Sequence, residues 1–252
     1  MKRFPLILLM LAAVACVGQK DDEEDIDIPE PVATPAVGRS LVIDFTATWC
    51  VNCPRMTGAI EEAQAERPGE IVPLSVHFSD SFACPDGLSL VSRFGVQAYP
   101  SAVIDMDRES LTTATSKDLL LSRVDERKSR KKEACLLEVS AVSPAEGSLE
   151  AAVSVTAMAD DGYRLWVLLV EDALVAPQTG GSENEVHNAV LRRFLHEGAD
   201  GYALGSLSSG ATAQWNGSFE GLTPGRSRVI VFVTEETSSL VNTVVSVPVE
   251  TH

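Results

Sequence analysis

The sequence of 252 residues lacks the spacing of a metal site and the positive charge typical of a nucleic-acid-binding protein. It contains one Cys-x-x-Cys segment, without a second one or a His-x-x-x-His, so a regular set of zinc ligands is missing. The histidines share no ligand spacing; they are His77, His187, His196 and His252. The net charge is −16, which disfavours nucleic acid as a partner. We therefore expect no metal, no cofactor and no nucleic-acid partner.

The apolar segment at the N-terminus, residues 4–13, is too short to span a bilayer. It follows the basic pair Lys2-Arg3, and this order predicts an export signal peptide over residues 1–15. The small residues before Cys16 resemble a bacterial lipobox, which implies that Cys16 carries lipid after cleavage. Residues 16–37 are acidic and contain proline without an apolar period, so we expect a disordered tether.

The residues after Cys16 also indicate a location. Gln19-Lys20 followed by a run of acidic residues resembles the surface-export signal of outer-membrane lipoproteins in one Gram-negative phylum. A solvated acidic tether is an alternative that is compatible with this interpretation. The expected location is the cell outer membrane, with a lipid anchor and exposure at the surface.

One segment of the chain indicates redox chemistry. An apolar run over residues 41–46 is followed by Trp49-Cys50-Val51-Asn52-Cys53 at the start of a predicted helix. Unpaired N–H groups and the macrodipole at a helix N-terminus stabilise a thiolate, which is the form that attacks disulfides. Cys50 is therefore predicted to attack, and Cys53, one turn later, is placed to resolve the mixed disulfide.

Two further features accompany this segment. Asp44 lies at an inward-facing position of the predicted strand, where burial would raise its pKa and allow proton exchange with Cys53. The alternative is a strand-end aspartate that is exposed to water. Pro100 directly precedes another predicted strand, where a cis bond after Tyr99 would leave the Tyr99 backbone free to pair with an extended substrate. The alternative is a trans proline that leads into an edge strand.

Together these residues resemble the thioredoxin fold from about residue 39 to residue 132. The resemblance implies that Cys50 and Cys53 form the redox-active disulfide and that Asp44 is the buried acid. It also implies that Trp49, Tyr99 and Pro100 line the substrate groove. Two departures, the Val51-Asn52 dipeptide and Thr46, leave the direction of the redox reaction open, because such positions influence the reduction potential.

The periodicity agrees with an α/β domain over residues 38–133. Strands are predicted at 41–46, 71–78, 101–106 and 111–115, and helices at 54–67, 88–94 and 116–132. The last helix ends in a basic cluster consisting of Arg127, Lys128, Arg130, Lys131 and Lys132. We expect these cations to complement the helix dipole.

From Cys135 the pattern changes to short alternating strands, which predicts an antiparallel β-sandwich over residues 134–252. The expected strands lie at 137–140, 149–157, 163–171, 211–219, 229–234 and 243–249. Residues 173–204 interrupt this rhythm and contain Ala176-Pro177-Gln178 and Val186-His187-Asn188. With the preceding half, these motifs resemble the twenty-eight-kilodalton outer-membrane-protein family of lipoproteins. They indicate no chemistry by themselves, and His187 is expected to be a structural hydrogen-bonding residue.

The junction near Lys132 contains almost no glycine, proline or serine, so we expect the two halves to pack closely. We also expect the sandwich to lie away from the redox groove and to leave it open. Cys84 and Cys135 could form a disulfide between the halves or remain single thiols.

Two functions are compatible with the sequence. In the first, the protein is an exported oxidoreductase that acts on protein thiols and disulfides in the cell envelope. In the second, it is a non-enzymatic surface lipoprotein with a structural disulfide, and its β-sandwich mediates binding.

Overall fold

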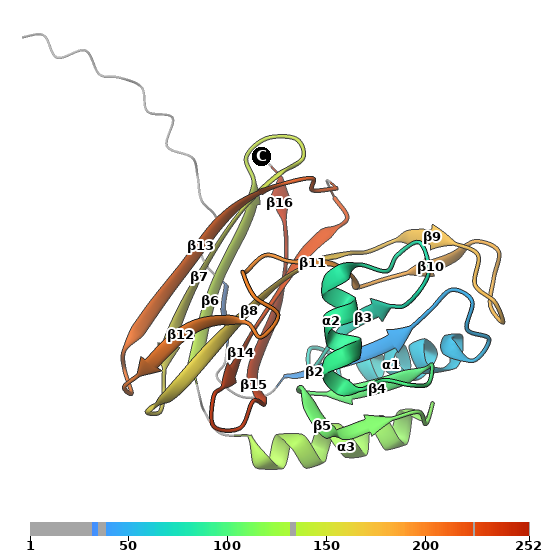
Figure 1. The fold of residues 1–252 in the computed structure, drawn as a ribbon, viewed down its shortest axis with the longest axis horizontal. Coiled ribbons are helices and arrows are strands. Elements are labelled where there is room, and N and C mark those ends of the chain that lie inside the picture. The colour runs from blue at the N-terminus through green and yellow to red at the C-terminus, as the bar shows by residue number, and fades with distance from the viewer. Residues whose placement is uncertain (1–31, 35–38, 132–134, 224, 252) are drawn as a thin grey trace, which may run out of the picture.

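The structure is a computed structural model that describes residues 32–34, 39–131, 135–223 and 225–251 (Figure 1). The predicted signal peptide, the lipidation site Cys16 and most of the acidic tether lie outside these residues. Residues 32–34, which we expected to belong to the disordered tether, instead form strand β1, because their backbone pairs antiparallel with that of β6 (Cys135–Ser143). Within the described part of the chain, no helix has the length and apolar character needed to cross a membrane.

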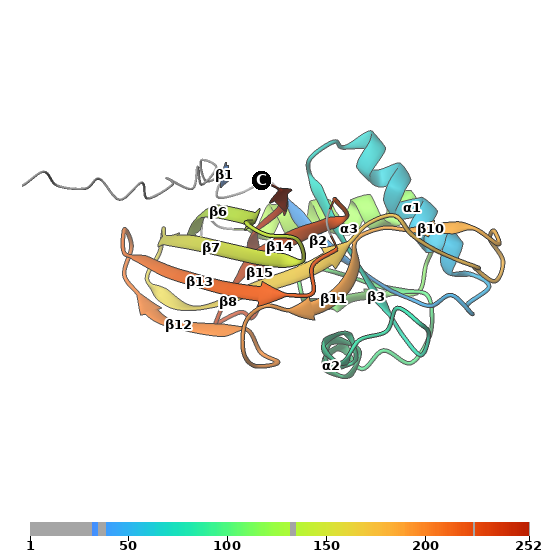
Figure 2. The ribbon, with the colours of Figure 1, turned by 90° about the horizontal axis from the view of Figure 1, so that it is seen from above.

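The first half is the expected α/β unit. Its elements are β2 (Ser40–Thr46), α1 (Cys53–Glu66), β3 (Ile71–His77), α2 (Pro85–Phe94), β4 (Ser101–Ile104), β5 (Asp107–Thr112) and α3 (Lys117–Arg130). Strand β2 is buried throughout, and it pairs parallel with β3 and antiparallel with β4. Helix α2 covers one face of this sheet, whereas α1 and α3 cover the other (Figure 2). Helix α2 begins earlier than expected because Cys84 accepts a hydrogen bond at its N-cap and Pro85 fits the first turn.

The second half forms the expected sandwich. One layer is a five-stranded sheet of β1 (Val32–Thr34), β6 (Cys135–Ser143), β7 (Ser148–Ala157), β13 (Thr212–Glu220) and β16 (Glu250–Thr251). The facing layer contains β8 (Asp161–Glu171), β14 (Ser227–Glu235) and β15 (Val241–Pro248). The two layers bury a core that includes Leu137, Val153, Leu165 and Val231.

The two halves share one nine-stranded sheet, in the order β15-β14-β8-β11-β3-β2-β4-β5, with β12 (Tyr202–Leu207) also paired to β8. Strand β11 (Val190–Phe194) joins the halves, because it runs antiparallel to β8 and parallel to β3. It lies inside the segment that we expected to be irregular. Five residues are too few for a clear period, and the arginines in Val-Leu-Arg-Arg-Phe weaken the apolar signal. The change of pattern at Cys135 therefore does not separate two independent sheets.

Strand β8 is buried on both faces. Tyr163, Leu165 and Val167 face the sandwich core, whereas Trp166 and Leu168 belong to the core beneath α2. Such a strand forms a continuous apolar run instead of alternating with polar residues. The apolar run of β8 thus reflects a strand whose two faces pack into two different hydrophobic cores.

The basic end of α3 has a larger role than complementing the helix dipole. Lys131 Nζ lies 3.0 Å from Asp105 Oδ2, and both side chains are fully buried. The other oxygen of Asp105 accepts a hydrogen bond from the Leu41 N–H at 2.8 Å. Arg127 is also buried and reaches the carbonyl oxygen of Val241 in β15 at 3.5 Å. These side chains tie α3 to the beginning of β2 and to the second half.

Cys84 and Cys135 are not joined to each other. The Cys84 sulfur accepts a hydrogen bond from the Gly87 N–H at 3.3 Å. Cys135 lies in β6 with no exposed surface, and burial raises the pKa of its thiol to about 12. Both are therefore single thiols with local packing roles.

Candidate redox site

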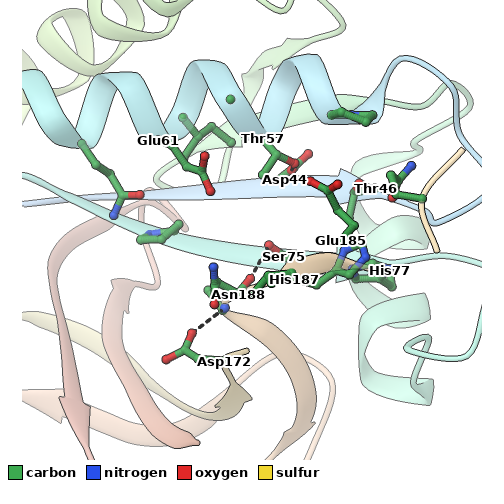
Figure 3. Close-up of a pocket in the computed structure, with 18 of the residues that line it drawn as sticks. Asp44, Thr46, Thr57, Glu61, Ser75, His77, Asp172, Glu185, His187 and Asn188 are labelled. Atoms are coloured by element: carbon green, nitrogen blue, oxygen red, sulfur yellow. Dashed lines mark hydrogen bonds between the residues drawn. The ribbon is translucent and has the colours of Figure 1, made fainter. Parts of the chain in front are cut away.

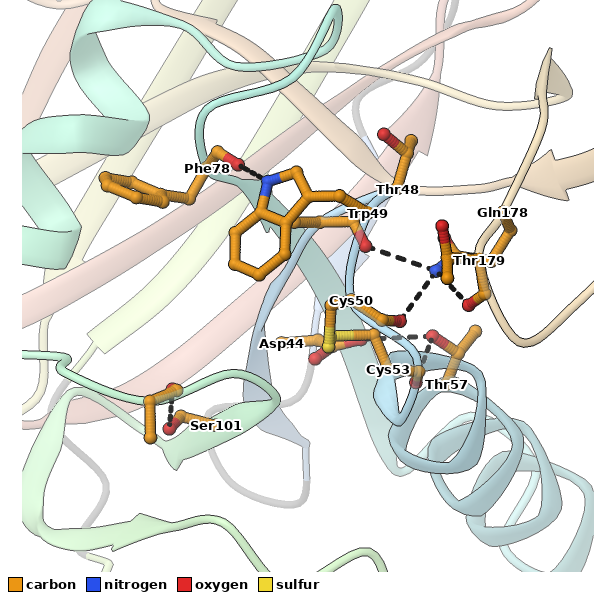
Figure 4. The surroundings of a disulfide bond; sticks show 12 residues. Asp44, Thr48, Trp49, Cys50, Cys53, Thr57, Phe78, Ser101, Gln178 and Thr179 are labelled. Atoms are coloured by element: carbon orange, nitrogen blue, oxygen red, sulfur yellow. Dashed lines mark hydrogen bonds between the residues drawn. A yellow bond between two sulfur atoms is a disulfide. The ribbon is translucent and has the colours of Figure 1, made fainter.

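A disulfide joins Cys50 and Cys53 where the loop after β2 enters α1 (Figure 4). Cys50 is 5 % exposed and Cys53 is 1 % exposed. The loop is tightened by backbone hydrogen bonds from Cys50 N–H to the Ala47 carbonyl at 3.1 Å and from Cys53 N–H to the Cys50 carbonyl at 3.3 Å. The side chain of Asn52, at the N-cap, accepts no hydrogen bond from the N–H groups of this helix end. The first turn of α1 thus keeps the partial positive charge that favours a thiolate nearby.

Asp44 lies beneath the disulfide and is 2 % exposed. The Thr57 hydroxyl lies 3.3 Å from Asp44 Oδ2 and 3.4 Å from the Cys53 carbonyl oxygen, so one side chain links the acid to the first turn of α1. Burial raises the pKa of Asp44 to about 7, and the hydrogen bond from Thr57 acts in the opposite direction. A carboxyl group with this pKa can both accept and return a proton near neutral pH.

An aromatic cluster lies beside the disulfide. Trp49 is 48 % exposed, and its indole N–H donates to the Phe78 carbonyl at 3.1 Å. The Tyr99 ring stacks on Phe78 with centroids 5.1 Å apart and meets Trp49 edge-on at 5.7 Å. The peptide bond between Tyr99 and Pro100 is cis. The structure thus brings Trp49, Tyr99 and the disulfide together at one surface.

Asp80 fixes the redox loop through a hydrogen bond to its backbone. Its Oδ2 accepts hydrogen bonds from the Thr48 N–H and from His77 Nδ1, both at 2.8 Å. Burial would raise the pKa of Asp80, but the hydrogen bond and charge of His77 outweigh it and the pKa is lowered. Phe78 and Asp80 were not expected at the site. Since β2 and β3 are parallel, the residues that follow β3 adjoin the redox loop that follows β2, and this topology could have indicated them.

A loop from the second half also reaches the redox site. It connects β9 (Leu174–Ala176) to β10 (Glu185–His187). The buried Gln178 amide donates to the carbonyl oxygens of Cys50 at 2.9 Å and of Ala47 at 3.2 Å. The Thr179 N–H donates to the Thr48 carbonyl at 2.8 Å. The expectation that the second half lies away from this site is therefore wrong, although Trp49 on the other side remains accessible.

Gly180 shows how closely the two loops approach. Its φ is +80°, and a Cβ atom there would lie 2.3 Å from the Val51 carbonyl oxygen. Only glycine accommodates both the left-handed backbone and this contact. Gln178 belongs to the Ala-Pro-Gln motif whose role the sequence left unassigned, so this motif is a contact to the redox loop.

The fold of the first half and its Cys-x-x-Cys disulfide define a thioredoxin-like domain. The thioredoxin family model matches residues 33–132. Among the described residues, no group of three or more histidine, cysteine, aspartate or glutamate side chains has the arrangement of a metal site.

Solved structures resemble the chain beyond this domain. HBP35 of Porphyromonas gingivalis is 16% identical, with a TM-score of 0.68 over 84% of this chain and 76% of that chain. A protein of Agrobacterium tumefaciens is 14% identical, with a TM-score of 0.54 over 87% of this chain and 100% of that chain. At these identities the likeness concerns the fold alone, and it extends over both halves.

A domain of the outer membrane lipoprotein Omp28 from Porphyromonas gingivalis is also similar. It is 13% identical and covers 46% of this chain and 89% of that chain, with a TM-score of 0.30. This score is too low to support an argument about this chain.

Proposed function

We propose that the protein is an exported, lipid-anchored thiol–disulfide oxidoreductase that acts on protein disulfides of the cell envelope. The observation that carries this proposal is the Cys50–Cys53 disulfide at the start of α1 with the buried Asp44 beneath it. A purely structural disulfide requires neither a buried acid without a cationic partner nor an exposed tryptophan beside it.

In the reducing direction, the Cys50 thiolate attacks one sulfur of a substrate disulfide. A mixed disulfide forms, and the other substrate sulfur leaves as a thiolate. Cys53 then attacks the Cys50 sulfur, which releases the second substrate thiolate and forms the Cys50–Cys53 disulfide. Two electrons pass from the protein dithiol to the substrate, and the reverse sequence oxidises a substrate dithiol. Trp49, Tyr99 and Pro100 line the groove for the substrate chain.

Asp44 exchanges a proton with the Cys53 thiol. As a carboxylate it accepts the thiol proton while Cys53 attacks, and as an acid it returns a proton when Cys53 leaves. Its burial and its pKa of about 7 support this role, because both forms are populated near neutral pH. Thr57 positions the carboxyl group through the contact with Oδ2.

The cellular location in this proposal rests on the N-terminal sequence. Residues 1–15 are the signal peptide, Cys16 carries the lipid, and the tether runs from Cys16 to strand β1, ahead of the units at 38–133 and 134–252. Replacing Cys16 by serine should release the protein from the membrane fraction. If the variant remained membrane-bound, the lipid anchor would be wrong.

The activity is tested with the full chain and a disulfide-bonded protein substrate. Cys50→Ser should abolish turnover, and Cys53→Ser should accumulate a mixed disulfide through Cys50. Cys84→Ser is the matched control, because its thiol is single and distant in sequence from the pair, and it should retain activity. Equal activity in Cys50→Ser and Cys84→Ser would refute the assignment.

A second function has one observation in its favour. The loop of Gln178 closes against the redox loop, and Cys50 is only 5 % exposed, as suits a static disulfide in a surface binding protein. The reduction potential distinguishes the two. A value below about −300 mV, inert to glutathione, would favour the structural disulfide.

A further inference from the structure

Asp44 lines a cavity of about 470 Å³ whose wall includes none of the aromatic residues Trp49, Phe78 and Tyr99. Helix α1 and the adjoining strands β2 and β3 form one wall, and β10 with the residues after it forms the other (Figure 3). The site therefore combines both halves of the chain. It is separate from the groove beside Trp49, which does not line it.

The charges around this cavity are unbalanced. Four carboxylic acids line it: Asp44, Glu61, Asp172 and Glu185. The basic lining residue, Arg228, is engaged with Asp172, to which it donates at 2.5 and 2.9 Å. Glu61 and Glu185 have no such cationic partner among the ion pairs of the described residues. The cavity therefore carries an excess of negative charge.

The buried polar atoms without a partner are a second, independent sign. Around this cavity they are Asp44 Oδ1, His77 Nε2 and His187 Nε2. Asp44 and His77 are 2 % and 3 % exposed, so water outside the protein does not satisfy them. Buried polar atoms in proteins are normally hydrogen-bonded.

Two of these atoms act as acceptors: the carboxyl oxygen Asp44 Oδ1 and His187 Nε2. His77 Nδ1 is hydrogen-bonded to Asp80, which leaves His77 Nε2 without a partner beside the cavity. Burial, followed by the nearby His77, lowers the pKa of His187, and its ring makes a hydrogen bond to the Ala176 backbone. The neutral His187 ring thus also presents an acceptor at Nε2.

Several donors on the cavity wall are already engaged with the protein. Gln178 donates to the redox loop, Ser75 donates to the Asn188 carbonyl at 2.9 Å, and Thr57 lies at the other oxygen of Asp44. The cavity consequently presents buried acceptors and acidic groups, and its complement is a ligand with N–H donors and positive charge.

From this arrangement we infer that the cavity is a binding site for a compact organic cation with a primary ammonium or guanidinium group. The cation reaches Asp44 Oδ1 at the inner end and is neutralised by Glu61 and Glu185 nearer the surface. The cationic group belongs either to a free amine or to a lysine or arginine side chain of a partner protein.

Calorimetric titration of the oxidised full chain tests this inference. Butane-1,4-diamine is the probe, and butane-1,4-diol is its neutral counterpart of the same length. The diamine should bind at one saturable site and the diol should not bind. A terminally blocked Ala-Lys-Ala peptide distinguishes the sources: binding of the diamine alone identifies a free amine, and binding of the peptide identifies a side chain.

Paired variants locate the site. The double variant Glu61→Gln/Glu185→Gln should weaken diamine binding about tenfold, because two charge-assisted contacts are lost. Glu62→Gln/Glu183→Gln is the matched control, since it removes the same charge from neighbouring positions that do not line the cavity. Its affinity should stay within about twofold of the parent.

Three results would overturn the inference: absence of saturable diamine binding, equal binding of the diol, or equal weakening in the two double variants. Binding of the diamine does not need a thiol. A protein that binds the diamine but fails to exchange disulfides would therefore keep this site and lose the proposed redox function.

Discussion

Two buried aspartates, one near each end of β2, differ in whether a cationic side chain lies beside the carboxyl group. Asp105 lies next to Leu41, near the beginning of the strand, where Lys131 is 3.0 Å away. Burial raises the pKa of Asp105 and lowers that of Lys131, and each charge partly offsets the shift of the other. Among the described residues, the hydrogen-bond partner of the Asp44 side chain, near the end of the strand, is the Thr57 hydroxyl.

The difference separates a structural carboxylate from one that can change its protonation. A buried ion pair with further hydrogen bonds fixes the position of the elements that it joins. A buried carboxyl group without a cation remains neutral or charged according to pH, and such groups gather at functional sites. The comparison therefore supports the disulfide end of β2 as the place of the proposed chemistry, whereas the buried ion pair at the other end is structural.

The largest expected effect comes from Asp44→Asn. The pKa of Asp44 is about 7 in the folded protein and 3.8 in the reference state, so the parent should lose stability as pH rises from about 4 to about 7. At pH 8 the variant should be more stable by up to about 4 kcal/mol. Urea unfolding across this pH range measures the effect.

The control for this variant is Asp118→Asn, whose side chain is 90 % exposed. It should leave the pH dependence of stability unchanged. Asp44→Asn should also slow resolution by Cys53 while the formation of the Cys50 thiolate is retained. A parent protein whose stability is constant between pH 4 and pH 7 would contradict the raised pKa of Asp44.

Lys131→Met should have the next largest effect, because it leaves Asp105 buried beside the more distant Arg127. We expect a loss of about 3 kcal/mol in the free energy of unfolding. Lys128→Met, on the same helix, removes a partly exposed pair with Glu70 and should cost less than about 1 kcal/mol. Equal losses in urea unfolding would show that the Asp105 contact is no more important than a surface pair.

Gln178→Ala should have the smallest effect on stability, about 1–2 kcal/mol, because two carbonyl groups of the redox loop lose a donor. It should also shift the Cys50–Cys53 reduction potential, measured in glutathione buffers, because the second half no longer holds the loop. Gln64→Ala is the matched control, since Gln64 also lines the cavity but its amide donates to the Ile71 carbonyl and not to the redox loop. An unchanged potential in Gln178→Ala would show that the contact only fastens the halves.

The sequence by itself determined the elements whose signals are local. The apolar run before Trp49, the Cys-x-x-Cys spacing and the strand after Pro100 lie within short windows, where periodicity and helix termini indicate structure directly. The inward position of Asp44 followed from the alternation along one strand. The thioredoxin-like first half and the sandwich layers could therefore be predicted from the residues.

Only the tertiary structure decided how the halves combine. Strand β11 is short and partly polar, and it becomes a strand because β8 and β3 offer their backbone groups on either side. Gln178 reaches Cys50 across 128 positions of sequence, and Lys131 meets Asp105 only when α3 packs against the sheet. These contacts depend on the path of the whole chain, and neither a period nor a motif within one segment contains that information.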